Sequence, residues 1–153
     1  MSTNGYLEGC VREGQAMIKD KEHAMREMSA IVMEFVEEGN EKADLVERYL
    51  LQLEKSPSSR EAVAEVFRAM HTIKGATGFL GFTKLSTLAH TGESLLVRLR
   101  DGALVANPQI VNALLSLVDA VRESLSDIAA TGQEGNREYE ALISTLVRLQ
   151  KAG

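Results

Sequence analysis

The sequence contains few of the residues that mark secreted, metal-bound or strand-rich proteins. Its 153 residues include one cysteine, two prolines and no tryptophan, and only 5% are aromatic. The single cysteine, Cys10, excludes a disulfide within the chain and any zinc-ribbon spacing. A chain of this kind suits a reducing compartment, and we expect it to be cytoplasmic.

Long apolar runs and an excess of basic residues are also missing. No run approaches the roughly 18 apolar residues that a membrane span needs, and the N-terminus has no signal-peptide pattern. The net charge of −5 argues against a nucleic-acid partner, because phosphate contacts need a concentrated basic surface. We therefore expect a soluble domain with neither membrane insertion nor nucleic-acid binding.

Helical periodicity is what the sequence does have, and no segment alternates as a strand would. Long amphipathic segments joined by short loops are typical of helical bundles. The helices are expected at residues 29–55, 59–78, 83–100, 108–130 and 137–150. This pattern predicts an all-α fold, an antiparallel up-down four-helix bundle with an additional C-terminal helix.

Residues 1–28 precede this domain, which we place at residues 29–153. Residues 1–14 are rich in glycine and predict a tail, and residues 15–28 predict a weak helix. In the first bundle helix Ile31 is a candidate core residue, and Gly39 is expected to interrupt the pattern.

Two helix starts carry clear end signals. Ser58 and Glu61 have the spacing of a capping box before the second helix, and Asn107-Pro108 is a strong start for the fourth.

The second helix carries the most informative segment. At about 100° per residue, His71, Lys74, Gly75 and Gly78 share one side of the helix, away from the apolar stripe that includes Met70. A nucleophilic imidazole thus has a cation one turn away and open surroundings. This arrangement suits a histidine that carries a phosphoryl group while another protein docks over it.

Spacing alone leaves other interpretations open. His71 could be a surface histidine without function, Lys74 an ordinary solvated charge, and the two glycines sites of tight packing within the bundle. His71, His90 and Glu93 could also form a two-histidine, one-carboxylate metal set. The Glu-x-x-His order of di-iron bundles is absent, however, and Lys74 would repel a cation, so we expect no metal.

His90 and Glu93 lie one turn apart on the third helix. A carboxylate at the edge of a helix–helix seam can accept a hydrogen bond from one ring nitrogen of His71, which fixes the tautomer and leaves the other nitrogen as the nucleophile. The alternative for Glu93 is a charge at the rim of the bundle. Gly92, between these two residues, is expected to loosen the turn.

Several segments together carry a family resemblance. The run Phe67-Arg68-Ala69-Met70-His71-Thr72-Ile73-Lys74-Gly75, then Gly81-Phe82, Leu88-Ala89-His90 and Glu93, resembles the histidine phosphotransfer (HPt) domain, in particular those of CheA-type chemotaxis kinases. The resemblance implies that His71 is phosphorylated, that Glu93 orients its ring, and that Lys74 and His90 support it.

The same resemblance implies two partners. A kinase ATP-binding domain would phosphorylate His71, and a CheY-like response-regulator receiver domain would take the phosphoryl group onto an aspartate. The residues expected near the partner-binding surface are Phe67, Arg68, Met70, Gly75 and Gly78.

The chain has no phosphate-binding loop of its own, because Gly75-Ala76-Thr77-Gly78 is too short and lies within a helix. We therefore expect no cofactor and no autophosphorylation, so that the chain is a relay or the phosphotransfer part of a kinase. The alternative is a helical adaptor that binds partners through the same face without being phosphorylated.

Overall fold

The fold is entirely helical over the part of the chain that the structure describes. The computed structural model describes residues 4–152, with side chains from residue 7 onward. The helices are α1 (Asn4–Lys55), α2 (Arg60–Leu80), α3 (Thr83–Arg100), α4 (Pro108–Thr131) and α5 (Glu140–Lys151). The predicted all-α class is confirmed.

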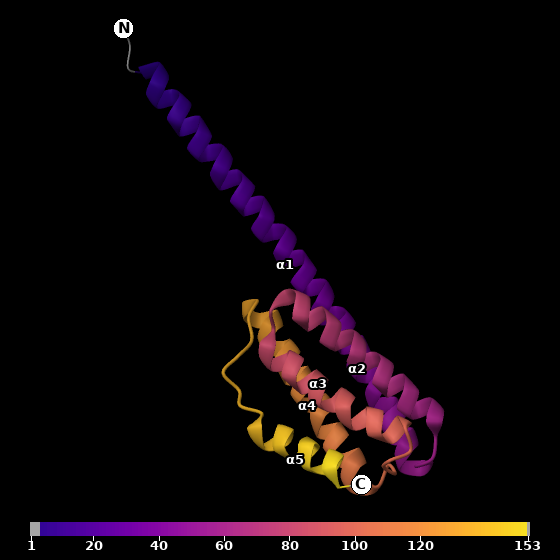
Figure 1. The fold of residues 1–153 in the computed structure, drawn as a ribbon. Coiled ribbons are helices and arrows are strands. Elements are labelled where there is room, and N and C mark those ends of the chain that lie inside the picture. The colour runs from indigo at the N-terminus through magenta and orange to yellow at the C-terminus, as the bar shows by residue number, and fades with distance from the viewer. Residues whose placement is uncertain (1–3, 153) are drawn as a thin grey trace.

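The first four helices form an antiparallel bundle. Successive helices run in opposite directions (Figure 1). Helices α1 and α3 each contact both α2 and α4, and α5 packs against α3 and α4. The fully buried side chains at the centre are mostly leucines, among them Leu50, Leu53, Leu88, Leu95, Leu117 and Leu125. The predicted bundle with an additional C-terminal helix is therefore confirmed.

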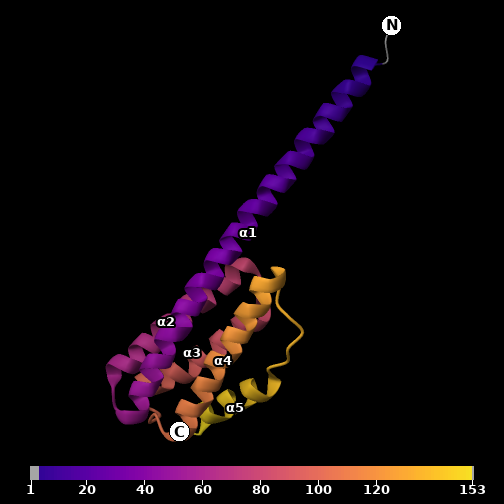
Figure 2. The same ribbon diagram turned by 180° about the vertical axis from the view of Figure 1, so that it is seen from behind.

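Helix α1 is much longer than the sequence predicted. It runs without a break from Asn4, so the expected tail at residues 1–14 is wrong from residue 4 onward, and residues 1–3 lie outside the described part. Its N-terminal half projects beyond the bundle as a single rod (Figures 1 and 2). Ile31, expected in the core, is 43% exposed because the bundle begins only near Val32.

Gly39 does not interrupt α1, contrary to the expectation. It is buried, and a Cβ atom there would lie 2.9 Å from Cδ1 of Leu125 on α4. The glycine therefore allows α1 and α4 to approach closely, and this packing offsets its low helix propensity.

The start of α2 is one residue later than predicted. The N-cap is Ser59, whose Oγ accepts a hydrogen bond of 3.2 Å from the Ala62 amide, so Ser58 and Glu61 do not form a capping box. Asn107 caps α4 as predicted, with its Oδ1 2.9 Å from the Ile110 amide. Helix α2 passes through Gly78 and ends before Gly81, which has a φ of 79°.

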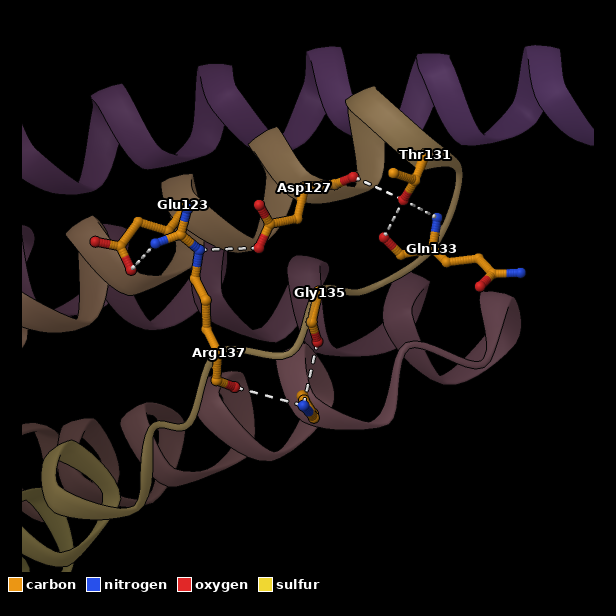
Figure 3. Close-up of polar contacts among 7 residues, drawn as sticks. Glu123, Asp127, Thr131, Gln133, Gly135 and Arg137 are labelled. Carbon is orange, nitrogen blue, oxygen red and sulfur yellow. Dashed lines mark hydrogen bonds and ion pairs between the residues drawn. The ribbon is translucent and has the colours of Figure 1, made fainter.

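The loop between α4 and α5 is held by polar contacts. Its Glu134 carboxylate accepts hydrogen bonds from the backbone amides of Lys84 (3.3 Å) and Leu85 (2.8 Å), at the start of α3. Arg137 donates to Asp127 of α4 at 2.9 Å (Figure 3). Because Arg137 belongs to this loop, α5 begins at Glu140 rather than at the predicted residue 137.

Candidate functional site

His71 lies on the outer side of α2, and its side chain is 65% exposed. Residues on the opposite side of the helix, such as Val66 and Ile73, are buried in the bundle. The packing of that apolar stripe fixes which way α2 faces and so places the imidazole on the surface.

Glu93 of α3 joins His71 and Lys74. Its Oε2 lies 3.3 Å from Nδ1 of His71, and its Oε1 lies 3.5 Å from Nζ of Lys74. The Glu93 side chain is only 14% exposed, so the carboxylate is a partly buried anchor rather than a rim charge. The structure thus brings together three of the residues that the sequence singled out.

This geometry selects one tautomer of His71. A carboxylate can only accept, so Nδ1 carries the proton and donates it to Glu93. The lone pair is then on Nε2. In an exposed imidazole whose Nδ1 is hydrogen-bonded to a carboxylate, the unprotonated Nε2 can act as a nucleophile toward an incoming electrophile.

Gly92 explains how Glu93 reaches the seam. A Cβ atom at Gly92 would overlap Cδ2 of Leu117 and would lie 3.5 Å from Cε of Met70. The glycine therefore marks a close approach of α3 to its neighbours, and it does not loosen the turn as expected. Tight packing at this residue fixes the position of the adjacent carboxylate.

Gly75 and Gly78 have the opposite environment. A Cβ atom at either position would meet nothing within 4 Å, so tight packing within the bundle does not explain them. They leave a low, open surface beside His71. Phe79 follows them and is 81% exposed, and sequence reasoning missed it although it lies opposite the apolar stripe of α2.

Aromatic and cationic groups border the imidazole on its N-terminal side. The Phe67 ring stacks with that of His71, with centroids 6.0 Å apart and an interplanar angle of 15°. Cζ of Arg100, at the end of α3, lies 4.6 Å from the Phe67 centroid. No sequence pattern relates Arg100 to Phe67, because only the packing of α3 on α2 brings them together.

The other predicted site residues differ in their surroundings. Met70 is only 2% exposed, so its expected place on the partner-binding surface is wrong; it packs toward Gly92 instead. Arg68 is exposed and pairs with Glu65 at 2.9 Å. His90 is exposed, and its side chain makes no hydrogen bond within residues 7–152, so its supporting role stays a prediction.

Neither a metal site nor a membrane span is found in the described part of the chain. Over these residues, no three His, Cys, Asp or Glu side chains gather closely enough to hold a metal ion. None of the described helices combines the length and apolar character that crossing a bilayer requires.

Comparison with known proteins points to one family. The sequence model of the Hpt domain matches residues 30–124, which include His71, Lys74 and Glu93. The chemotaxis protein CheA of Halobacterium salinarum is 39% identical over 98 residues, 64% of this chain. The sensor histidine kinase CheAY of Helicobacter pylori is 30% identical over 128 residues, 84% of this chain. The chain spans only 15% and 16% of the length of these two relatives.

Solved structures agree with the sequence comparison. The phosphorylated P1 domain of CheA3 from R. sphaeroides, in complex with CheY6, superposes with a TM-score of 0.75 at 28% identity, covering 82% of this chain and 99% of that one. The CheA phosphotransferase domain from Thermotoga maritima gives a TM-score of 0.63 at 31% identity, covering 65% of this chain and 95% of that one.

Proposed function

This chain belongs to the Hpt domain family, and from that premise we propose that His71 accepts a phosphoryl group from the ATP-binding domain of a histidine kinase and passes it to an aspartate of a response-regulator receiver domain. The observation that carries the proposal is the hydrogen bond between His71 Nδ1 and Glu93, in an imidazole that is otherwise open to a partner. The solved complex of a phosphorylated CheA3 P1 domain with CheY6 supports the receiver as the second partner.

The chemistry needs two nucleophilic displacements. In the first, the Nε2 lone pair attacks the γ-phosphorus of ATP held by the kinase, the N–P bond forms, and the bond from that phosphorus to the bridging oxygen of ADP breaks. In the second, a carboxylate oxygen of the receiver aspartate attacks the same phosphorus and the N–P bond breaks, which returns the electron pair to Nε2.

Glu93 has the same role in both steps. Phosphorylation of Nε2 with a proton on Nδ1 leaves the ring cationic, and the adjacent carboxylate stabilises that cation. Lys74 holds the second oxygen of Glu93 and so keeps the carboxylate oriented. The nucleotide site and the aspartate belong to the partners, so this domain supplies the carrier histidine and its orienting groups.

The proposal is tested by phosphorylation with a purified CheA-type kinase ATP-binding domain and ATP labelled at the γ-phosphate. We expect acid-labile, base-stable label on the protein, its loss in His71→Gln, and its retention in the control His23→Gln, which changes an exposed histidine of the rod. Equal labelling of His71→Gln would overturn the assignment. An unlabelled chain that still binds receiver domains would favour the adaptor alternative.

A further inference from the structure

The rod formed by the N-terminal half of α1 carries an apolar stripe that nothing in the described chain covers. Its apolar side chains are between 43% and 72% exposed. We name this set the N-terminal stripe: Leu7, Val11, Ile18, Met25, Met28 and Ile31. Over 24 residue steps it extends for about 36 Å along the helix.

The N-terminal stripe has the pattern of a helix-packing surface. Apolar or small residues recur every seven residues in three series, which together make a face about 100° wide. The series are residues 7, 14 and 28; residues 10, 17, 24 and 31; and residues 11, 18, 25 and 32. Lys21 is the one charged residue within it. At 100° per residue this face points the same way as Val32, Val36 and Val46, the residues of α1 that pack in the bundle.

We propose that a second copy of this chain covers the N-terminal stripe, and that the two rods pair in antiparallel orientation. The proposal is independent of the phosphotransfer function. Its carrying observation is that the stripe ends where the bundle begins, on the same side of α1 as the buried residues of the bundle. Helix α1 runs unbroken from the rod into the bundle (Figures 1 and 2).

The bundle decides between the two orientations. Helices α2 and α4 occupy the packing face of α1 from about Val32 onward. A parallel rod lying on the N-terminal stripe would therefore run into the end of the bundle. An antiparallel rod instead ends there, and its own bundle lies beyond the far end of the pair.

The end of the bundle offers a place for the incoming rod. A hollow of about 530 Å³ lies where α1 leaves the bundle, between Met25, Met28 and Val32 of α1 and Ile128 near the end of α4. In the register that places Leu7 opposite Ile31 of the second copy, the N-terminal end of each rod reaches this hollow. The same register places Gly14 opposite Ala24, so small residues face each other across the pair.

Charges beside the stripe fit this register. On one flank, Glu8 lies near Arg26 of the second copy, and Glu22 lies near Arg12 of the second copy; each match occurs twice by symmetry. The other flank carries Glu13, Asp20 and Glu27 and faces the same residues of the second copy. Lys21 can lay its alkyl stem on the stripe and direct its ammonium to Asp20 of the second copy, which offsets the like charges there.

The first test is the mass of the full 153-residue chain by sedimentation equilibrium. We expect a concentration-dependent dimer, whose dissociation constant Ile18→Glu raises by at least about tenfold, since it places a charge on the stripe. The control Ala16→Glu introduces the same charge on the opposite side of the rod and should leave the dimer intact. A chain that is monomeric throughout, or a dimer insensitive to Ile18→Glu, would overturn the proposal.

The second test fixes the orientation through the native thiol. In the antiparallel register the two Cys10 residues are about 27 Å apart along the rods, whereas Cys10 faces residue 28 of the second copy. Mild oxidation should therefore leave the native chain uncrosslinked and should crosslink Met28→Cys into a disulfide dimer through the introduced thiol and Cys10. A rapid Cys10–Cys10 disulfide in the native chain would contradict the antiparallel arrangement.

These tests are separable from phosphotransfer. The substituted residues lie on the rod, away from His71, so both Ile18→Glu and Ala16→Glu should retain the circular dichroism of the native bundle and accept label as before. Loss of the dimer with normal labelling assigns the effect to the N-terminal stripe alone.

Discussion

Glu93 is the residue on which the reactivity of His71 depends most directly. It is the hydrogen-bond acceptor for Nδ1, and at 14% exposure it is shielded from most competing water. A neutral amide in its place would still accept from Nδ1, but without the charge. A hydrogen bond to a charged group contributes about 1.5–3 kcal/mol, and one between neutral groups about 0.5–1.5 kcal/mol.

We therefore expect Glu93→Gln to slow phosphorylation of His71 by roughly 5- to 10-fold with little loss of helicity. The measurement is the initial rate of label uptake at saturating kinase. Glu65→Gln is the matched control, because Glu65 lies on α2 and pairs with exposed Arg68 rather than with His71. An unchanged rate in Glu93→Gln would remove the orienting role from this carboxylate.

Two glycines near the site should respond in opposite ways to the same substitution. Gly75→Ala should raise the free energy of unfolding by about 0.5–1 kcal/mol, because the new Cβ meets nothing within 4 Å and alanine favours the helix. Gly92→Ala should lower it by about 1–3 kcal/mol, because its Cβ would overlap the buried Leu117 side chain.

Urea unfolding of both variants beside the native protein checks this pair. If Gly75→Ala proved destabilising, the surface around His71 would have to be packed against something in the free protein. A neutral Gly92→Ala would show that Leu117 can move aside, and that the seam around Glu93 is looser than the distances indicate.

Sequence reasoning recovered the centre of the site but not its borders. Helical periodicity was enough to group His71 with Lys74 and to place Glu93 near the seam, since both inferences need only local geometry. Arg100 over Phe67 depends on how far α3 slides along α2, which no local pattern reports. Periodicity placed Met70 in the apolar stripe, where it is buried, and only the family resemblance had put it at the partner-binding surface.

At the scale of elements, helix α3 depends on a distant residue for its start. Phe82 at its N-cap offers no side-chain acceptor, and the Glu134 carboxylate accepts from two of the free backbone amides instead. A negative charge at a helix N-terminus is also favourable to the helix dipole. The α4–α5 loop is thereby tied to the helix that carries Glu93.

Glu134→Ala should therefore lower the free energy of unfolding by about 1–2 kcal/mol. Glu138→Ala is the control, since Glu138 is an exposed glutamate four residues further along the same loop. Chemical denaturation gives the comparison. Equal stability of the two variants would mean that water replaces the carboxylate at the α3 amides without cost.

Element boundaries were predictable where local chemistry decides them. The Asn107-Pro108 start needed only residues within one turn, and it was confirmed. Gly39 was expected to interrupt the pattern of the helix at residues 29–55, but packing against Leu125 outweighs the low helix propensity of glycine. The tail expected at residues 1–14 was wrong from residue 4 onward, because glycines were weighed more heavily than the heptad spacing that continues through them.

At the scale of the whole molecule, the bundle and the rod are structurally separable. The described residues before Val32 are exposed or nearly so, and the Hpt match begins only at residue 30. The rod thus contributes few buried side chains to the core of the bundle.

Removal of residues 1–28 should therefore leave a folded bundle whose free energy of unfolding changes by less than about 1 kcal/mol. His71 should accept label at the native rate in this shortened chain. Thermal unfolding and the labelling assay together check the prediction. An unfolded product would instead make the rod part of the cooperative domain, and the boundary at residue 29 would be wrong.

The unbroken course of α1 also has a mechanical consequence. A partner bound to the rod fixes the orientation of the bundle about the axis of α1, because a continuous helix transmits torsion. The direction in which His71 faces is therefore set relative to that partner. One inserted residue between the rod and the bundle would turn the face that carries His71 by about 100° and advance it by about 1.5 Å. Seven inserted residues would lengthen the spacer by about 10 Å and turn the face by only about 20°. The number of residues between the rod and the bundle therefore sets both the distance of His71 from the rod and the direction in which it faces.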